Sequence, residues 1–167
     1  FPRPFRIFIF GGGHVSKELA AIALGVDFQV TVMDDRPEFT DARRFSGAET
    51  ALLPSLTEED AARFLSGRNI GDRDGMVIVT RGHAFDRDTL AAALRTKAGY
   101  IGMIGSKSKR AAVYANLEQQ GVARKRLEDV YSPIGLAIGA DTPQEIAVSI
   151  AAELILWRST KQKADAN

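Results

Sequence analysis

A glycine-rich loop is the strongest chemical signal in this sequence. Gly11, Gly13 and Ser16 occupy the three positions of a G-x-G-x-x-G/A pattern, directly after an apolar run at residues 5–10. The two glycines allow a tight turn and a close approach of a phosphate to the backbone N–H groups. A helix that begins near His14 would point its positive end at that anion. We therefore expect phosphate contacts from Gly11, Gly12, Gly13, His14 and Val15.

An acidic residue follows the second expected strand, at residues 28–33. In dinucleotide-binding folds an acid at this place bonds the ribose hydroxyls, which makes Asp34 the ribose candidate. Arg36 lies two residues further on and could reach a phosphate. The alternative is a tight turn between strand and helix that binds no ligand. The order of strand, glycine loop, helix, strand and acid favours a nucleotide-type ligand.

Both histidines of the chain are expected just after strands, at the edge of the sheet where ligands of such folds bind. His14 lies in the glycine loop, and His83 follows Arg81 in a second loop. We expect Arg81 and His83 to contact the ligand, although His83 could also be an ordinary exposed loop residue. Asp86 is expected to cap the next helix. A metal site made of His14, His83 and Asp86 matches no local metal motif, so no metal site and no catalytic residue is predicted.

A basic segment, GSKSKR at residues 105–110, opens another expected helix. Cations in the first turn of a helix oppose its dipole, at a cost of about 0.3–1 kcal/mol each. A bound anion would reverse that cost, and we find no other reason for Lys107, Lys109 and Arg110 to lie there. We expect the anion to contact Gly105, Ser106 and Lys107. The alternative is a solvated basic face.

Strands and helices alternate along the whole chain. Apolar runs predict strands at residues 5–10, 28–33, 51–53, 76–80 and 100–104, and helices follow the first, third, fourth and fifth. The alternation predicts a Rossmann-like, doubly wound parallel α/β sheet with helices on both faces. We expect one such domain over residues 1–160.

The last predicted helix begins at a capping box, TPQE at residues 142–145, and runs to about Arg158. The loop before it holds Ile134, Leu136 and Ile138, which we expect in the core. The polar tail, residues 161–167, is expected to fray.

Composition limits the classes of function. The 167 residues fit one domain, and a net charge of +1 gives no electrostatic reason to expect a nucleic-acid partner. The absence of cysteine excludes disulfides and thiol chemistry, and no apolar run is long enough for a membrane span. A cytoplasmic location is expected. Because the chain begins with Phe, we expect it to be part of a longer protein.

Five motifs, in this order, resemble the C-terminal domain of the xanthine dehydrogenase accessory (XdhC/CoxI) family. The motifs are FGGGHVS, DDRPE, VIVTRGHAFD, YIGMIGSKSKR and SPIGLAIGADTPQEIAVSI. The resemblance implies a Rossmann-type domain that binds the molybdenum cofactor, as molybdopterin or its dinucleotide form. It also implies delivery of that cofactor to an apo molybdenum hydroxylase such as xanthine dehydrogenase. Full-length members carry a further N-terminal domain, often with a cysteine, so cofactor sulfuration that needs a thiol is not expected of this chain alone.

Two alternatives to the accessory function remain open. One is an NAD(P)-dependent oxidoreductase, with His83 or Tyr100 as proton donor, and the other is a nucleotide-sensing module without chemistry. One 167-residue domain leaves little room for a separate substrate domain, which disfavours the oxidoreductase. The sequence also leaves the oligomeric state open, including a homodimer.

Overall fold

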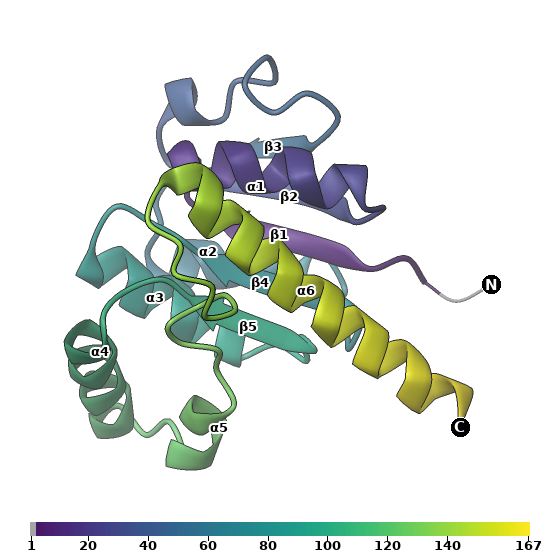
Figure 1. The fold of residues 1–167 in the computed structure, drawn as a ribbon. Coiled ribbons are helices and arrows are strands. Elements are labelled where there is room, and N and C mark those ends of the chain that lie inside the picture. The colour runs from purple at the N-terminus through teal and green to yellow at the C-terminus, as the bar shows by residue number, and fades with distance from the viewer. Residues whose placement is uncertain (1–2) are drawn as a thin grey trace.

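The computed structural model describes residues 3–167 and has three layers, with one sheet between two sets of helices (Figure 1). All five strands are parallel, in the order β3-β2-β1-β4-β5. This order confirms the predicted doubly wound Rossmann-like sheet. The strands are β1 (Arg6–Phe10), β2 (Gln29–Asp34), β3 (Glu49–Leu52), β4 (Asp74–Ile78) and β5 (Tyr100–Met103).

The central strand β1 is buried on both faces, as its continuous apolar sequence predicts. Ile7 and Ile9 belong to the core beneath one helical layer, whereas Phe8 and Phe10 belong to the core beneath the other. The first layer holds α1 (His14–Gly25) and α6 (Pro143–Ala166), which pack against each other. The second layer holds α2 (Glu58–Ser66), α3 (His83–Leu94), α4 (Lys107–Gln119) and the short α5 (Arg124–Glu128).

Three helices begin at side-chain caps that the sequence predicts. Thr57 accepts a hydrogen bond from the backbone of Asp60, and Ser106 accepts one from Lys109. Thr142 and Glu145 form the complete capping box at the start of α6. Each cap satisfies a backbone N–H that the first helical turn leaves without a partner.

The C-terminal tail departs from its prediction. α6 continues to Ala166 instead of ending near Arg158, so the tail is helical and not frayed. Asp165 accepts hydrogen bonds from Lys161 at 2.6 Å and from Arg73 at 2.8 Å. The last turn has no apolar pattern. It is stabilised by an ion pair between two helix residues four positions apart and by a contact with a neighbouring loop.

Some expectations in the irregular segments are wrong. Ile138 is 54% exposed and lies outside the core, whereas Ile134 is buried. A one-turn helix η1 (Pro37–Phe39) and α5 were not predicted from the sequence. Among residues 3–167 no helix has the length and apolar character needed to cross a membrane.

Candidate functional site

The glycine loop lies between the carboxyl ends of β1 and β4, where the connections of the sheet diverge. Gly11 has φ +103°, and a Cβ added to it would lie 2.4 Å from the carbonyl oxygen of Val79. Only glycine fits here, because the loops after β1 and β4 touch through their backbones. The structure therefore brings the two predicted site loops together at one point.

Gly12 is held entirely by groups of the protein. Its N–H donates to the carboxylate of Asp34 at 2.9 Å, and its carbonyl accepts from Nε of Arg44 at 3.0 Å. A Cβ on Gly12 would lie 2.1 Å from the carbonyl oxygen of Phe39 in η1. Gly12 thus fixes the loop, and its own N–H already has an acceptor.

Gly13 differs from its two neighbours. It is the N-cap of α1 with an ordinary φ of −73°, and a Cβ on it would have no atom within 4 Å. No side chain among residues 3–167 caps α1. The protein's own packing therefore does not require glycine here. The open space and the N–H groups of the first turn, which begins at His14 and Val15, suit a closely bound anion.

α3 begins in the same way at the neighbouring strand. Its N-cap is Gly82, in an extended conformation and without a side-chain cap. Of the helices of eight or more residues in the described chain, α1 and α3 are the two that lack such a cap. His14 and His83 are the first residues of these helices, and both are exposed.

The predicted ribose ligand Asp34 is fully buried, and both of its oxygens accept hydrogen bonds from the protein. Arg36 donates from its backbone N and its Nε, each at 3.0 Å. Burial alone would raise the pKa of this carboxyl, but the bonds from Arg36 and Gly12 outweigh it and lower the pKa to about 2. Asp34 is therefore ionised and holds the loop in place.

Arginines surround the same loops. Arg81 pairs with Asp35 at 2.5 Å and so links the loops after β4 and β2. The hydrogen bond to Asp35 is the main cause that raises the pKa of Arg81. The guanidinium of Arg36 lies 3.8 Å from the ring centre of Phe39, over its face. Sequence reasoning missed Arg44 and Phe39, because they lie in an irregular segment without any periodic pattern.

Asp86 was expected to cap α3. Instead, it lies inside the first turn of this helix. It is fully buried and accepts hydrogen bonds from Thr80 and from Lys109 of α4. Burial raises the pKa of this carboxyl, although Lys109 and Thr80 act in the opposite direction. Because the Asp86 carboxylate is bonded to Thr80 and Lys109, it is not available to join His14 and His83 around a metal ion. Residues 3–167 contain no cluster of acids and histidines that could hold a metal ion.

The same contact corrects the interpretation of the basic segment. Lys109 neutralises Asp86, and Arg110 donates to the carbonyl of Ser132 at 2.5 Å, so two of the three cations have partners inside the fold. Lys107 is exposed and forms no ion pair within the described chain. Only Lys107, beside Gly105 and Ser106, still lacks an internal explanation for its place in the helix.

Tyr100 does not reach the glycine loop. It begins β5, is 1% exposed, and donates from its hydroxyl to Glu153 at 2.7 Å. Burial, and then the charge of Glu153, raise its pKa well above 10. These contacts exclude Tyr100 as the proton donor of an oxidoreductase at this site.

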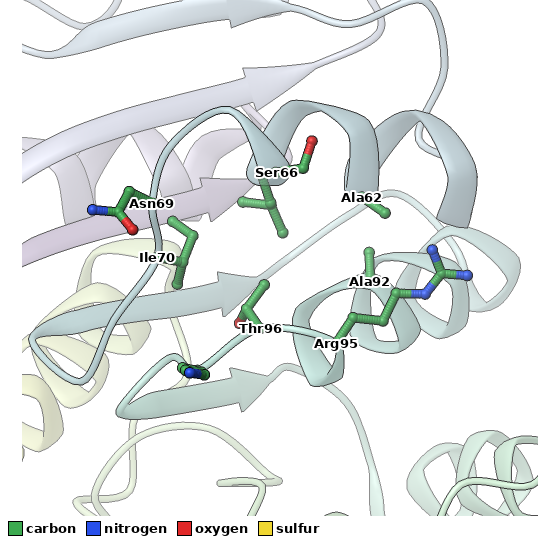
Figure 2. Close-up of a pocket in the computed structure, with 9 residues that line it drawn as sticks. Ala62, Ser66, Asn69, Ile70, Ala92, Arg95 and Thr96 are labelled. Atoms are coloured by element: carbon green, nitrogen blue, oxygen red, sulfur yellow. The ribbon is translucent and has the colours of Figure 1, made fainter.

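A cavity of about 420 Å³ lies between the C-terminal ends of α2 and α3, at the opposite edge of the sheet. Figure 2 shows Ala62 of α2 pointing toward Ala92 of α3, with Arg95 just after the last residue of α3. Arg95 is paired with Glu58 at 2.5 Å. The cavity contains none of the predicted site residues, so the carboxyl edge remains the candidate site.

Comparison with known protein families identifies the family to which this fold and site belong. Residues 7–154 match the model of the XdhC Rossmann domain. The chain belongs to this family. The match includes the glycine loop, both uncapped helices and the basic segment, so the XdhC Rossmann domain provides the frame for every candidate contact described above.

Three relatives of this XdhC domain are informative. A protein from Bacillus subtilis, described as a probable xanthine dehydrogenase component, is 30% identical over 94% of this chain and 44% of its own length. YqeB of Escherichia coli, described as uncharacterized, is 29% identical over 90% of this chain and 27% of its own length. A solved structure from Bacillus halodurans, described as a xanthine dehydrogenase, is 32% identical with a TM-score of 0.80. The match covers 96% of this chain and 44% of that protein. The chain therefore spans less than half the length of these relatives.

Proposed function

We propose that this XdhC domain binds the molybdenum cofactor, as molybdopterin or its dinucleotide form, and serves the maturation of a molybdenum hydroxylase. Family membership and the names of the two xanthine dehydrogenase relatives support the accessory role. The client would be an apo-enzyme of the xanthine dehydrogenase kind. In that enzyme the cofactor supplies the redox chemistry, whereas in this domain it is cargo.

One observation carries the location of the site. α1 begins at Gly13 without a side-chain cap, and the space in front of Gly13 is open. A phosphate there would accept hydrogen bonds from the first-turn N–H groups and gain from the helix dipole. The start of α3 at Gly82 and His83 lies beside it and offers a second set of N–H groups. These groups bind and orient a phosphate-bearing molecule, and none of them needs to transfer a proton.

The charged residues have distinct places in this proposal. Arg36 and Arg81 are each paired with an acid of the same edge, Asp34 and Asp35, whereas Lys107 is free to approach an anion. Asp34 has no unpaired oxygen for a ribose, so it acts on the ligand through the shape of the glycine loop. Gly105 and Ser106 shape the start of α4, where Lys107 lies.

The test is a binding measurement with isolated molybdenum cofactor. The protein is dialysed to equilibrium under anoxic conditions, and bound molybdenum is counted per chain. In the Gly13→Val variant the side chain fills the space in front of α1, so bound molybdenum should fall about tenfold or more. Gly25→Val is the matched control, because Gly25 lies at the other end of α1 and also has open space around it.

Three results would count against the proposal. Equal binding by the wild type and Gly13→Val would remove the glycine loop as the site. Equal losses in Gly13→Val and Gly25→Val would show a general effect on α1. Tight binding of NADH with turnover of a substrate would favour the oxidoreductase instead.

A further inference from the structure

A hollow of about 490 Å³ lies between α6 and the segment that precedes this helix. Tyr131 and Leu136 of that segment line it, and Leu156 and Trp157 line it from α6. Backbone hydrogen bonds hold the segment to β5 at one end and to α6 at the other (Figure 1). This space, the α6 hollow, is therefore preformed, and its size and largely apolar walls are typical of a small-molecule site.

One charged side chain, Glu153, also lines the α6 hollow, although it is only 8% exposed. Its Oε1 accepts a hydrogen bond from the hydroxyl of Tyr100 at 2.7 Å and another from the backbone N–H of Gly135 at 3.1 Å. Within residues 3–167 no hydrogen bond reaches Oε2. Oε2 is not sealed in the interior either, so it reaches the surface of the hollow. The hollow thus presents a carboxylate oxygen that the fold leaves without a partner.

Glu153 differs in this respect from the other buried acids. The described chain contains four buried acids, and three of them are paired with a cation of the protein: Asp34 with Arg36, Asp74 with Arg6 and Asp86 with Lys109. Glu153 forms no ion pair within residues 3–167. A buried carboxylate is costly unless a cation and hydrogen bonds compensate it. A cation bound in the α6 hollow would supply the compensation that the fold does not.

The fold itself uses only one oxygen of Glu153. Oε1 ties the loop at Gly135 to Tyr100 of β5, and one acceptor is enough for that role, so a glutamine would serve equally well. Lys161 lines the same hollow, but its Nζ is bonded to Asp72 at 2.8 Å and to Asp165 at 2.6 Å. Lys161 is therefore engaged by these two acids instead of Glu153. The negative charge and the second oxygen of Glu153 are left for a ligand.

We propose that the α6 hollow binds a small organic cation, an ammonium or amidinium group carried on an aromatic or aliphatic body. The cationic head donates a hydrogen bond to Oε2 of Glu153, and the apolar body packs against Leu136 and Leu156. The ring of Trp157 adds a face that attracts a cation. The apolar walls would accept a neutral molecule as well, so the carboxylate is the group that selects for positive charge. The hollow contains no residue of the glycine loop, and the proposal is independent of the cofactor site.

A titration with benzamidine, followed by NMR, tests the proposal. Trp157 is the single tryptophan of the chain, so its indole N–H signal reports on this hollow alone. The wild type should bind benzamidine with a dissociation constant of about 1 mM or lower, the range of a small fragment. Benzamide has nearly the same shape but no charge. It should bind about tenfold or more weakly, because it cannot compensate the carboxylate.

Glu153→Gln separates the charge from the structural role. Glutamine keeps an acceptor for Tyr100 and Gly135 and replaces Oε2 with an NH₂ group, so the melting temperature should stay close to that of the wild type. Benzamidine should bind this variant about tenfold or more weakly, whereas benzamide should bind it at least as well as the wild type. Gly13→Val, which blocks the proposed cofactor site, should leave both titrations unchanged.

A second pair of variants tests the location without touching Glu153. Leu156→Lys puts a cation of the protein on the same helical face as Glu153, three residues away, and should block benzamidine. Ile155→Lys is the matched control, because Ile155 is exposed on the same helix but does not line the hollow, and it should bind as the wild type does.

Four results would overturn the proposal. These are a wild type that does not bind benzamidine up to about 10 mM, equal affinities for benzamidine and benzamide, full benzamidine binding by Glu153→Gln, and equal effects of Leu156→Lys and Ile155→Lys.

Discussion

The carboxylate of Asp34 accepts a hydrogen bond of 2.9 Å from the backbone N–H of Gly12. An acid at the end of β2 thus holds the loop at the end of β1, and Arg36 keeps that acid ionised. The loop is therefore positioned before any ligand binds, which lowers the entropic cost of binding. The sequence pattern places an acid here to bond ribose, whereas the structure gives it a supporting role within the protein.

The stability of the domain should depend on Asp34 at low pH. Its folded-state pKa of about 2 lies below the ordinary value of 3.8, so the unfolded state takes up a proton first as the pH falls. The stabilisation is present above pH 4 and is lost between about pH 4 and pH 2, by about 2 kcal/mol in total. Asp34→Asn should show that loss already at pH 6. Urea unfolding at pH 6 and pH 3 measures it.

The difference between the wild type and Asp34→Asn should therefore shrink at pH 3. Asp41→Asn is the control, because the Asp41 carboxyl is bonded to Arg43 at the surface, where solvent screens the pair, and the change should affect stability little at either pH. A constant difference at both pH values would contradict the assigned role of Asp34.

Alanine at two adjacent glycines should have opposite consequences. Gly12→Ala places a Cβ 2.1 Å from the Phe39 carbonyl and must displace η1, at a cost of about 2 kcal/mol or more. Gly13→Ala meets no atom and should cost less than about 1 kcal/mol. Thermal unfolding of both variants measures the difference. Equal losses would show that the loop is packed differently from the structure described above.

Local sequence signals predicted much of the fold. Continuous apolar runs predicted the strands, and Thr57, Ser106 and Thr142 predicted three helix starts, because each signal acts within a few residues. The alternation of strands and helices predicted the parallel sheet with helices on both faces. The glycine loop was placed correctly at the edge of the sheet by the same reasoning.

Contacts between distant segments could not be predicted in the same way. Asp86 suggested a helix cap, and Lys109 lies 23 residues away, so no local pattern reveals their pairing. Arg44 reaches Gly12 from an irregular segment. The helical tail depends on a contact between Asp165 and Arg73, which the sequence pattern of the tail does not predict. The partners of these residues are determined by tertiary structure, and patterns in a single sequence do not contain that information.

Removing the partner of a buried acid should be costly. Lys109→Met leaves the Asp86 carboxylate buried without its cation, at a cost of about 3–5 kcal/mol near neutral pH. Lys107→Met is the matched control in the same helical turn, because Lys107 is exposed and has no ion pair within residues 3–167. It should change stability by less than about 0.5 kcal/mol. Urea unfolding of both variants provides the comparison.

The pH dependence of Lys109→Met has the opposite sign to that of Asp34. The folded-state pKa of Asp86 is already raised by burial and should rise further without the lysine. A group with a raised pKa takes up its proton more readily in the folded state, so the variant should recover stability as the pH falls toward 4. A deficit that stays constant from pH 7 to pH 4 would show that lost packing, and not charge, is responsible.

Tyr100→Phe separates a structural from a chemical role. The hydroxyl donates to Glu153 at 2.7 Å, and Glu153 is 8% exposed, with one further hydrogen bond from Gly135 to the same oxygen. Removing the hydroxyl leaves a buried carboxylate with fewer donors, and we expect a loss of about 1.5–3 kcal/mol in the free energy of unfolding.

The ring of Tyr100 should remain in place in this variant, because its stacking on Tyr131, with centroids 4.6 Å apart, does not use the hydroxyl. Tyr131→Phe, on the exposed ring of that pair, is the control and should cost little. Cofactor binding should be unchanged in both variants, since the Tyr100 hydroxyl is buried against α6 and its pKa is raised well above 10. Lost binding with unchanged stability in Tyr100→Phe would contradict this assignment and return the hydroxyl to the candidate site.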